Sequence, residues 1–200
     1  MWNVKRIVIL AAVLSALAAF YFLAGDRRSR IAREKREAAR VLPLTGGSAV
    51  QFLSLEQKAT DAITLTKIGD AWRVKKPVTY PAEDFVAEGL GTALTTTTWE
   101  DSFPVAGADL QEMGLSDPAV KIGVGFDPAP SEVRTLLLGN PVPTGGFVYA
   151  RWQDEDKIFL VHNQFARSFE KTLYTVRKKR VFDIGWEGVQ GVEVTLPGRE

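Results

Sequence analysis

The chain has 200 residues, enough for one domain with a proper core or two small ones, and it contains no cysteine, which excludes disulfide bonds and cysteine-based metal or thiolate chemistry. Its net charge of +1 is unevenly divided: residues 26–40 carry seven basic and three acidic side chains, Lys5 and Arg6 add two positive charges, and the chain from Val41 onward is left at −5. A nucleic-acid-binding domain needs basic charge on its folded surface, so this distribution argues against nucleic acid as a partner.

Residues 7–25 form a stretch without any charged side chain. As a helix this stretch would measure roughly 28 Å, close to the thickness of the hydrocarbon core of a bilayer. A cleaved signal peptide and a buried core helix are the alternatives. The stretch is longer than the ~7–15 residues usual for a signal peptide, and it lacks the polar face of a core helix. We therefore predict that residues 1–25 are an uncleaved, single-pass transmembrane anchor.

A basic segment, residues 26–47, follows the predicted anchor. Its arginines and glutamates recur at i, i+4 spacing, which predicts a helical stalk. Each basic residue near an anionic membrane gains ~1 kcal/mol, so membrane lipid is an expected partner of the anchor and the stalk. Pro43 and the pair Gly46-Gly47 end the stalk and predict that the folded domain begins at Ser48.

The charges beside the anchor leave its orientation open. Lys5 and Arg6 favour a cytoplasmic N-terminus, whereas the denser arginine cluster after the anchor favours a cytoplasmic domain. The two interpretations place the folded domain on opposite sides of the membrane.

From residue 48 the apolar pattern changes to a period of two, which predicts strands at residues 50–53, 63–66 and 72–75. The last two flank Gly69-Asp70, a sequence typical of a hairpin turn. Glu83 and Asp84 begin a predicted helix that ends at the threonine run 95–98, because β-branched residues favour strands. A further strand is expected near residues 99–103.

The second half of the sequence is again rich in strand patterns. Strands are expected at residues 119–126, 133–138, 147–152 and 157–161, and a helix is expected at residues 163–173. Residues 48–187 would then form an α+β domain, a mostly antiparallel sheet with two helices in the order β-β-β-α, β-β-β-β-α. Residues 188–200 predict a further edge strand or the start of a second repeat.

Several short motifs in this order resemble the bacterial family called domain of unknown function 4340, over residues 50–184. The motifs are Asp70-Ala71-Trp72-Arg73-Val74, Met113-Gly114-Leu115-Ser116-Asp117-Pro118, Leu136-Leu137-Leu138-Gly139-Asn140, Gly145-Gly146-Phe147-Val148-Tyr149-Ala150-Arg151 and Val176-Arg177-Lys178. Lys178 stands where the family has an aspartate. The resemblance implies a bacterial inner-membrane protein with an extracytoplasmic domain, encoded near transporter genes of the gliding-motility ABC type. It implies no catalytic residues and no cofactor.

No pattern in the sequence predicts a catalytic, cofactor-binding or metal site. His162 is the only histidine and is predicted to cap a helix or lie on the surface. The acids 154–156 predict a solvated turn, since they lack the spacing of a calcium loop. Gly145-Gly146 predicts a flexible loop, because no helix start follows to bind a phosphate. The basic run 177–180 predicts a solvated face, with an acidic partner or lipid headgroups as the alternative. Five aromatic residues are predicted core or sheet-face positions: Trp72, Trp99, Phe147, Tyr149 and Trp152.

Three functions are compatible with this pattern. The first is a membrane-tethered, non-catalytic binding or scaffold module with a protein partner, an accessory of an ABC-type transport or cell-envelope complex. The second is an extracytoplasmic hydrolase that uses paired carboxylates, such as Asp117 with Glu132 or Asp154. The third is a sensor domain that binds a ligand between the two halves of the domain.

Overall fold

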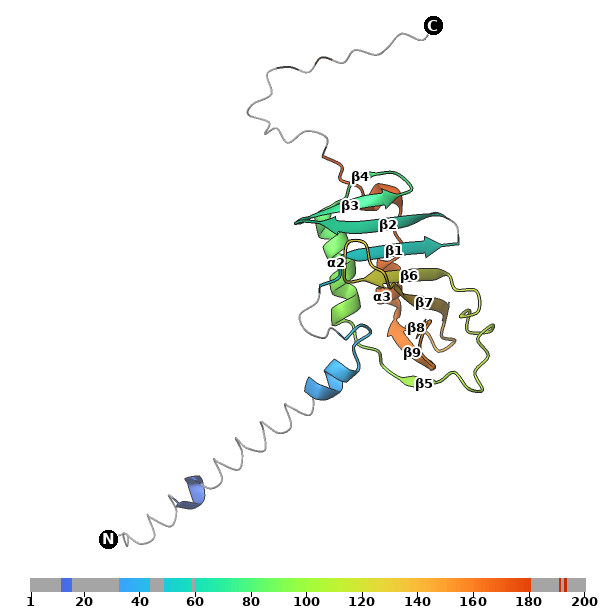
Figure 1. The fold of residues 1–200 in the computed structure, drawn as a ribbon. Helices are drawn as coiled ribbons and strands as arrows, with labels where there is room; N and C mark the ends of the chain where they lie inside the picture. The colour runs from blue at the N-terminus through green and yellow to red at the C-terminus, as the bar shows by residue number, and fades with distance from the viewer. Residues whose placement is uncertain are drawn as a thin grey trace, which may run out of the picture.

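Alternating apolar and polar residues build one antiparallel sheet, because successive side chains of a strand point to opposite faces. The computed structural model describes residues 12–15, 33–43, 49–58 and 60–180, together with positions 191 and 193. Within these residues the sheet has nine strands in the order β4-β3-β2-β1-β6-β7-β8-β9-β5 (Figure 1). The strands are β1 Phe52–Gln57, β2 Thr60–Ile68, β3 Ala71–Lys76, β4 Tyr80–Pro81, β5 Ser102–Pro104, β6 Val120–Gly125, β7 Arg134–Pro141, β8 Phe147–Trp152 and β9 Lys157–His162.

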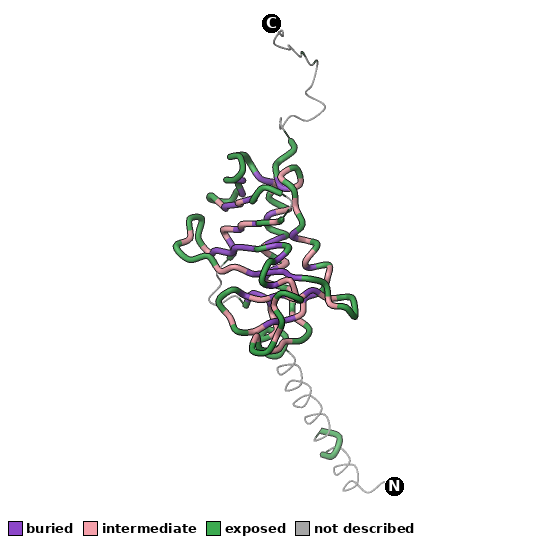
Figure 2. Tube along the Cα trace, turned by 90° about the vertical axis from the view of Figure 1, so that its right-hand side faces the viewer, coloured by how far each residue is buried: buried purple, intermediate pink, exposed green. Residues whose placement is uncertain are grey.

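Three helices cover one face of the sheet: α2 Asp84–Thr96, α3 Asn163–Ser168 and α4 Leu173–Val176. Their buried residues join one core with the inward side chains of the strands, and Figure 2 shows how the buried positions alternate along the chain. Trp72 and Trp152 lie in this core, each 2% exposed, as the sequence predicts. Trp99 is half-buried and packs against the same core. Phe147 and Tyr149 are half-buried on β8.

A long loop, residues 105–119, covers the other face of the sheet at its β7–β9 end. Leu115 from this loop packs with Leu137 and Ile158 in a second apolar cluster. Gly139 permits the close approach of the loop, because a Cβ atom there would meet the carbonyl oxygen of Met113. Both faces are therefore covered at this end of the sheet.

The end of the predicted stalk packs into the domain. Val41 and Leu42 are 2% and 1% exposed, and their amides donate to the carbonyl oxygens of Thr97 (2.9 Å) and Leu94 (3.1 Å) at the end of α2. The indole Nε1 of Trp152 donates to the carbonyl oxygen of Val41 at 2.9 Å. These residues, which the sequence places in a linker, are part of the fold.

The predicted α+β class and the order of the long elements are confirmed. The sequence missed β4 and α4, and β5 is a short edge strand that pairs with β9. The single helix predicted for residues 163–173 is wrong. Helix α3 ends at Ser168, and a separate turn, α4, begins after Thr172, whose hydroxyl accepts from the amide of Thr175.

Helix α2 extends two residues into the threonine run, further than predicted. The hydroxyls of Thr95 and Thr96 donate to carbonyl oxygens of the preceding turn, at 3.2 Å to Gly91 and 2.7 Å to Thr92. This backbonding accommodates threonine in a helix.

The predicted anchor, residues 1–25, lies outside the described residues apart from positions 12–15, and so does most of the segment 188–200. In the part of the chain that the structure describes, no helix has the length and apolar character needed to cross a bilayer.

Candidate functional site

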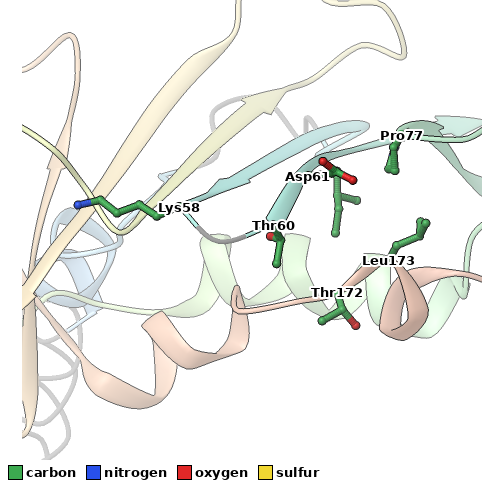
Figure 3. A pocket seen from close by; sticks show the side chains of 7 residues that line it. Lys58, Thr60, Asp61, Pro77, Thr172 and Leu173 are labelled. Carbon is green, nitrogen blue, oxygen red and sulfur yellow. The ribbon is translucent and has the colours of Figure 1, made fainter.

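An open groove of about 560 Å³ lies among the described residues. We call it the distal groove. Its lining, drawn in Figure 3, consists of Lys58, Thr60, Asp61, Ile63, Pro77, Thr172 and Leu173. The groove joins both halves of the sequence, and its volume lies in the range of small-molecule and peptide sites.

Strand ends and one helix cap position these side chains. Thr60 and Asp61 open β2, Pro77 follows the last residue of β3, and Thr172 caps α4. The amide Nε2 of Gln57 donates to the carbonyl oxygen of Lys171 at 2.7 Å, which holds the end of β1 against the segment before α4.

The distal groove has an apolar floor and a polar rim. Ile63 is 1% exposed at the floor, whereas Asp61 is exposed. Lys58 pairs with Asp117 at 2.6 Å, but both side chains are more than half exposed, so the pair contributes little stability. The carboxylate of Asp61 has no ion pair within the described residues. An apolar floor with an unpaired rim carboxylate suits a peptide or a small amphipathic ligand.

A second polar cluster surrounds Arg134 at the start of β7. Its guanidinium donates to Asp154 (3.0 Å) and Glu155 (2.8 Å) and lies 4.5 Å from the ring centroid of Trp152. Partial burial acts to raise the pKa of Asp154. The hydrogen bond from Arg134, a backbone hydrogen bond and the guanidinium charge outweigh burial and lower that pKa. Arg134 thus fixes the turn between β8 and β9.

Replacing Asp154 by asparagine should lower the melting temperature at neutral pH and have little effect in acid. The lowered pKa of Asp154 means that its contribution is present at neutral pH and is lost as the pH falls through the folded-state pKa. The pair is half-exposed, so the effect should stay below about 1 kcal/mol. Thermal unfolding between neutral pH and pH ~2 measures it. Asp156→Asn is the control, since this fully exposed acid lies 3.9 Å from Arg151 and should show a smaller effect.

The fold brings together neither of the two predicted carboxylate pairs, Asp117 with Glu132 and Asp117 with Asp154. Asp117 precedes β6 and Glu132 follows it, so about 20 Å of strand separates them. Asp154 lies at the same end as Glu132, and both line a cavity of about 420 Å³ beside Arg134. The predicted pairing of Asp117 with either acid is therefore wrong, because Asp117 lies at the opposite end of β6.

The other predicted positions take structural roles. The Nδ1 atom of His162 accepts from the amide of Gln164 at 3.2 Å, so the predicted helix cap is confirmed. Gly145 and Gly146 have φ of 80° and 82° in the turn between β7 and β8. Within the described residues, no group of three or more histidine or acidic side chains is placed to hold a metal ion.

A pocket between the two halves of the domain was one of the three hypotheses, but none of the residues of the distal groove was predicted as a site residue. These residues come from the segments 58–63, 77 and 172–173, which are far apart in the sequence, and none of them belongs to a motif with a known chemistry. The one part of the groove that the sequence indicates is the hairpin of β2 and β3, because its pattern predicts that the start of β2 lies beside the end of β3.

Comparison with known proteins identifies a family and no function. No curated protein and no solved structure matches the chain. The family described as domain of unknown function (DUF4340) matches residues 72–200, which is more than half of the chain and includes β3 to α4. The chain therefore belongs to the DUF4340 family.

Proposed function

We propose that this chain is a membrane-tethered, non-catalytic binding module that serves as an accessory of an ABC-type transport or cell-envelope complex. The observation that carries the proposal is that α4, which borders the distal groove, contacts the start of α2, whereas residues 41–42 contact its end. A tether at one end and a binding groove at the other is the arrangement expected of a module that presents a surface to a partner.

The two ends of α2 make different contacts. At its start, Asp84 accepts from the backbone amide of Trp72 at 2.7 Å, and the amide of Glu83 donates to Val176 of α4. At its end, the carbonyl oxygens of Leu94 and Thr97 accept from residues 41–42. The 13 residues of α2 span about 20 Å. The α4 side of the distal groove is thus held about that far from the point where the stalk joins the domain.

The tether and the class of complex rest on the sequence. The uncharged stretch 7–25 supports insertion in a membrane, and the family resemblance supports the extracytoplasmic side of the bacterial inner membrane and a transport partner. In this arrangement the basic stalk lies at the lipid headgroups and the domain with a charge of −5 projects from the surface.

A photo-crosslinking amino acid at position 60 of the full-length chain should give one discrete crosslinked product in native membranes. Position 60 lines the distal groove, so a bound partner lies within reach of the probe. The matched control is the same probe at position 106, which is exposed in the loop after β5 and should give no product. Equal products from both positions would contradict a binding site at the groove.

Leu14→Arg tests the tether in the same experiment. A charge at the middle of a spanning helix costs about 2.5–3.5 kcal/mol on insertion scales, so the variant should leave the membrane fraction and lose the crosslink. Leu14→Phe keeps the stretch apolar and should behave as wild type. The tether is refuted by a Leu14→Arg variant that stays in the membrane fraction after an alkaline carbonate wash.

A further inference from the structure

Two basic segments that are far apart in the sequence meet at one edge of the sheet. Arg73 of β3 pairs with Pro81 of β4, and the carbonyl oxygen of Pro81 accepts from the amide of Lys178 at 2.9 Å. Ala82 forms an antiparallel bridge with Arg177. β4 therefore lies between β3 on one side and residues 177–178 on the other. Neighbouring strands are about 4.8 Å apart, so the backbones at Arg73 and Lys178 are separated by about 10 Å.

Residues 71–81 and 177–179, all of which the structure describes, carry six basic side chains and no acid, and Asp70 and Asp84 flank β3. Residues 71–81 contain Arg73, Lys75 and Lys76, and residues 177–179 contain three more basic residues. All six are exposed. Within the described residues, Arg73, Lys75, Lys76 and Lys178 form no ion pair. We call these six side chains the basic edge. The remainder of the chain from Val41 onward is acidic, so the positive charge is concentrated here.

An exposed aromatic ring lies within the basic edge. Tyr174 is 63% exposed, and the cations of Arg177 and Lys179 lie 5.2 and 5.1 Å from its ring centroid. Val78, in the connection between β3 and β4, is 51% exposed. The surface therefore offers an exposed ring and an exposed aliphatic side chain beside its positive charge.

We propose that the basic edge binds an acidic segment of a partner protein. The inference rests on the proposed function and names the chemistry of the partner: carboxylates that face the unpaired cations, with an apolar side chain against Tyr174. The six positive charges would steer such a segment toward the edge in solution.

The position of the edge favours a protein over the lipid headgroups of the anchoring membrane. Residues 33–43 join the domain at the end of α2 that is remote from β4, and Figure 1 shows them leaving the sheet at the side opposite β4. The basic edge lies near the start of α2, about 20 Å from that junction. The membrane that holds the stalk is thus at the other end of the domain.

Protection of an exposed sheet edge is the competing explanation. Charged side chains on an edge strand, lysine above all, prevent edge-to-edge aggregation. A negative charge has this effect as well as a positive one. Charge reversal separates the two roles, because glutamate at the same positions keeps the protection and removes the affinity for an acidic segment.

The test measures the binding of a short fluorescent peptide that alternates glutamate and valine. The full-length chain is placed in nanodiscs of neutral phosphatidylcholine, and binding is read by fluorescence anisotropy. The variant Arg73→Glu/Lys178→Glu should bind about tenfold more weakly than wild type, since two attractions become repulsions. The matched control Lys121→Glu/Arg167→Glu changes the net charge equally at exposed positions away from the edge and should bind as wild type.

Each other outcome overturns the proposal. Equal weakening by both double variants would show that the overall charge, and not the edge, attracts the peptide. Absence of peptide binding to wild type, or a higher affinity for vesicles that contain phosphatidylglycerol, would exclude an acidic protein segment as the ligand. An edge variant that stays soluble and keeps the wild-type peptide affinity would leave protection as the role of these residues. The nanodisc assay is independent of the groove crosslink, so each proposal can fail alone.

Discussion

Replacing Trp152 by alanine should lower the free energy of unfolding by about 3–5 kcal/mol. Trp152 is 2% exposed and joins three parts of the fold. Its ring lies in the main core, its Nε1 atom donates to Val41 at 2.9 Å, and the guanidinium of Arg134 lies 4.5 Å from its ring centroid. Alanine would leave a cavity and an unpaired carbonyl oxygen. Urea unfolding of the detergent-solubilised chain, followed by far-UV circular dichroism, measures the loss.

Two controls separate the contributions of Trp152. Phenylalanine keeps an aromatic ring in the core and removes the hydrogen bond, so Trp152→Phe should cost less than the alanine variant, with about 1 kcal/mol from the bond itself. Trp99→Ala removes a ring of the same size from a half-buried position and should also cost less. A Trp152→Ala variant no less stable than Trp99→Ala would contradict the central position of Trp152.

Replacing Leu42 by alanine should lower the free energy of unfolding by about 2–5 kcal/mol. Leu42 is 1% exposed, and its amide donates to the carbonyl oxygen of Leu94 at 3.1 Å. Such a cost is expected of a core residue, whereas a residue in a solvated linker would change stability by less than about 0.5 kcal/mol. The same urea unfolding experiment measures the difference.

Pro43→Ala is the neighbouring control for Leu42. Pro43 is exposed directly after Leu42, so its replacement should change stability by much less. Equal and small effects of Leu42→Ala and Pro43→Ala would show that the segment 39–43 is a linker and does not belong to the domain.

The strands and their hairpins could be predicted because they depend on residues that are close together in the sequence. Gly69, at a φ of 62°, makes the turn that the sequence predicts between β2 and β3, and Trp72 and Val74 alternate into the core on β3. The role of His162 was also predictable, because a strand end followed by a helical pattern favours a cap.

The contacts of residues 39–42 could not be predicted, because they depend on surfaces brought together only in the fold. Val41 and Leu42 are two apolar residues between a charged helix and a proline, which as a local pattern is typical of a linker. Their burial depends on Trp152, 111 positions away along the chain. Backbone hydrogen bonds to the end of α2 complete a contact that no period of two or 3.6 residues encodes.

The residues of the distal groove and the meeting of the two basic segments could not be predicted, for the same reason. The basic run 177–180 is visible in the sequence, and so are Arg73, Lys75 and Lys76, but each by itself predicts a solvated face. Only the pairing of residues 177–178 with β4 brings the two groups to one edge of the sheet.

The burial of Val41 and Leu42 fixes the described segment 33–43 to the domain. A linker would absorb a rotation of the stalk, but a segment hydrogen-bonded to α2 and to Trp152 transmits torque to the domain. With α2 as an arm of about 20 Å, a tilt of roughly 10° at the stalk would displace the far end of the domain by roughly 3–4 Å. Under the proposed function, a tilt that begins at the membrane surface would therefore move a partner bound at that end.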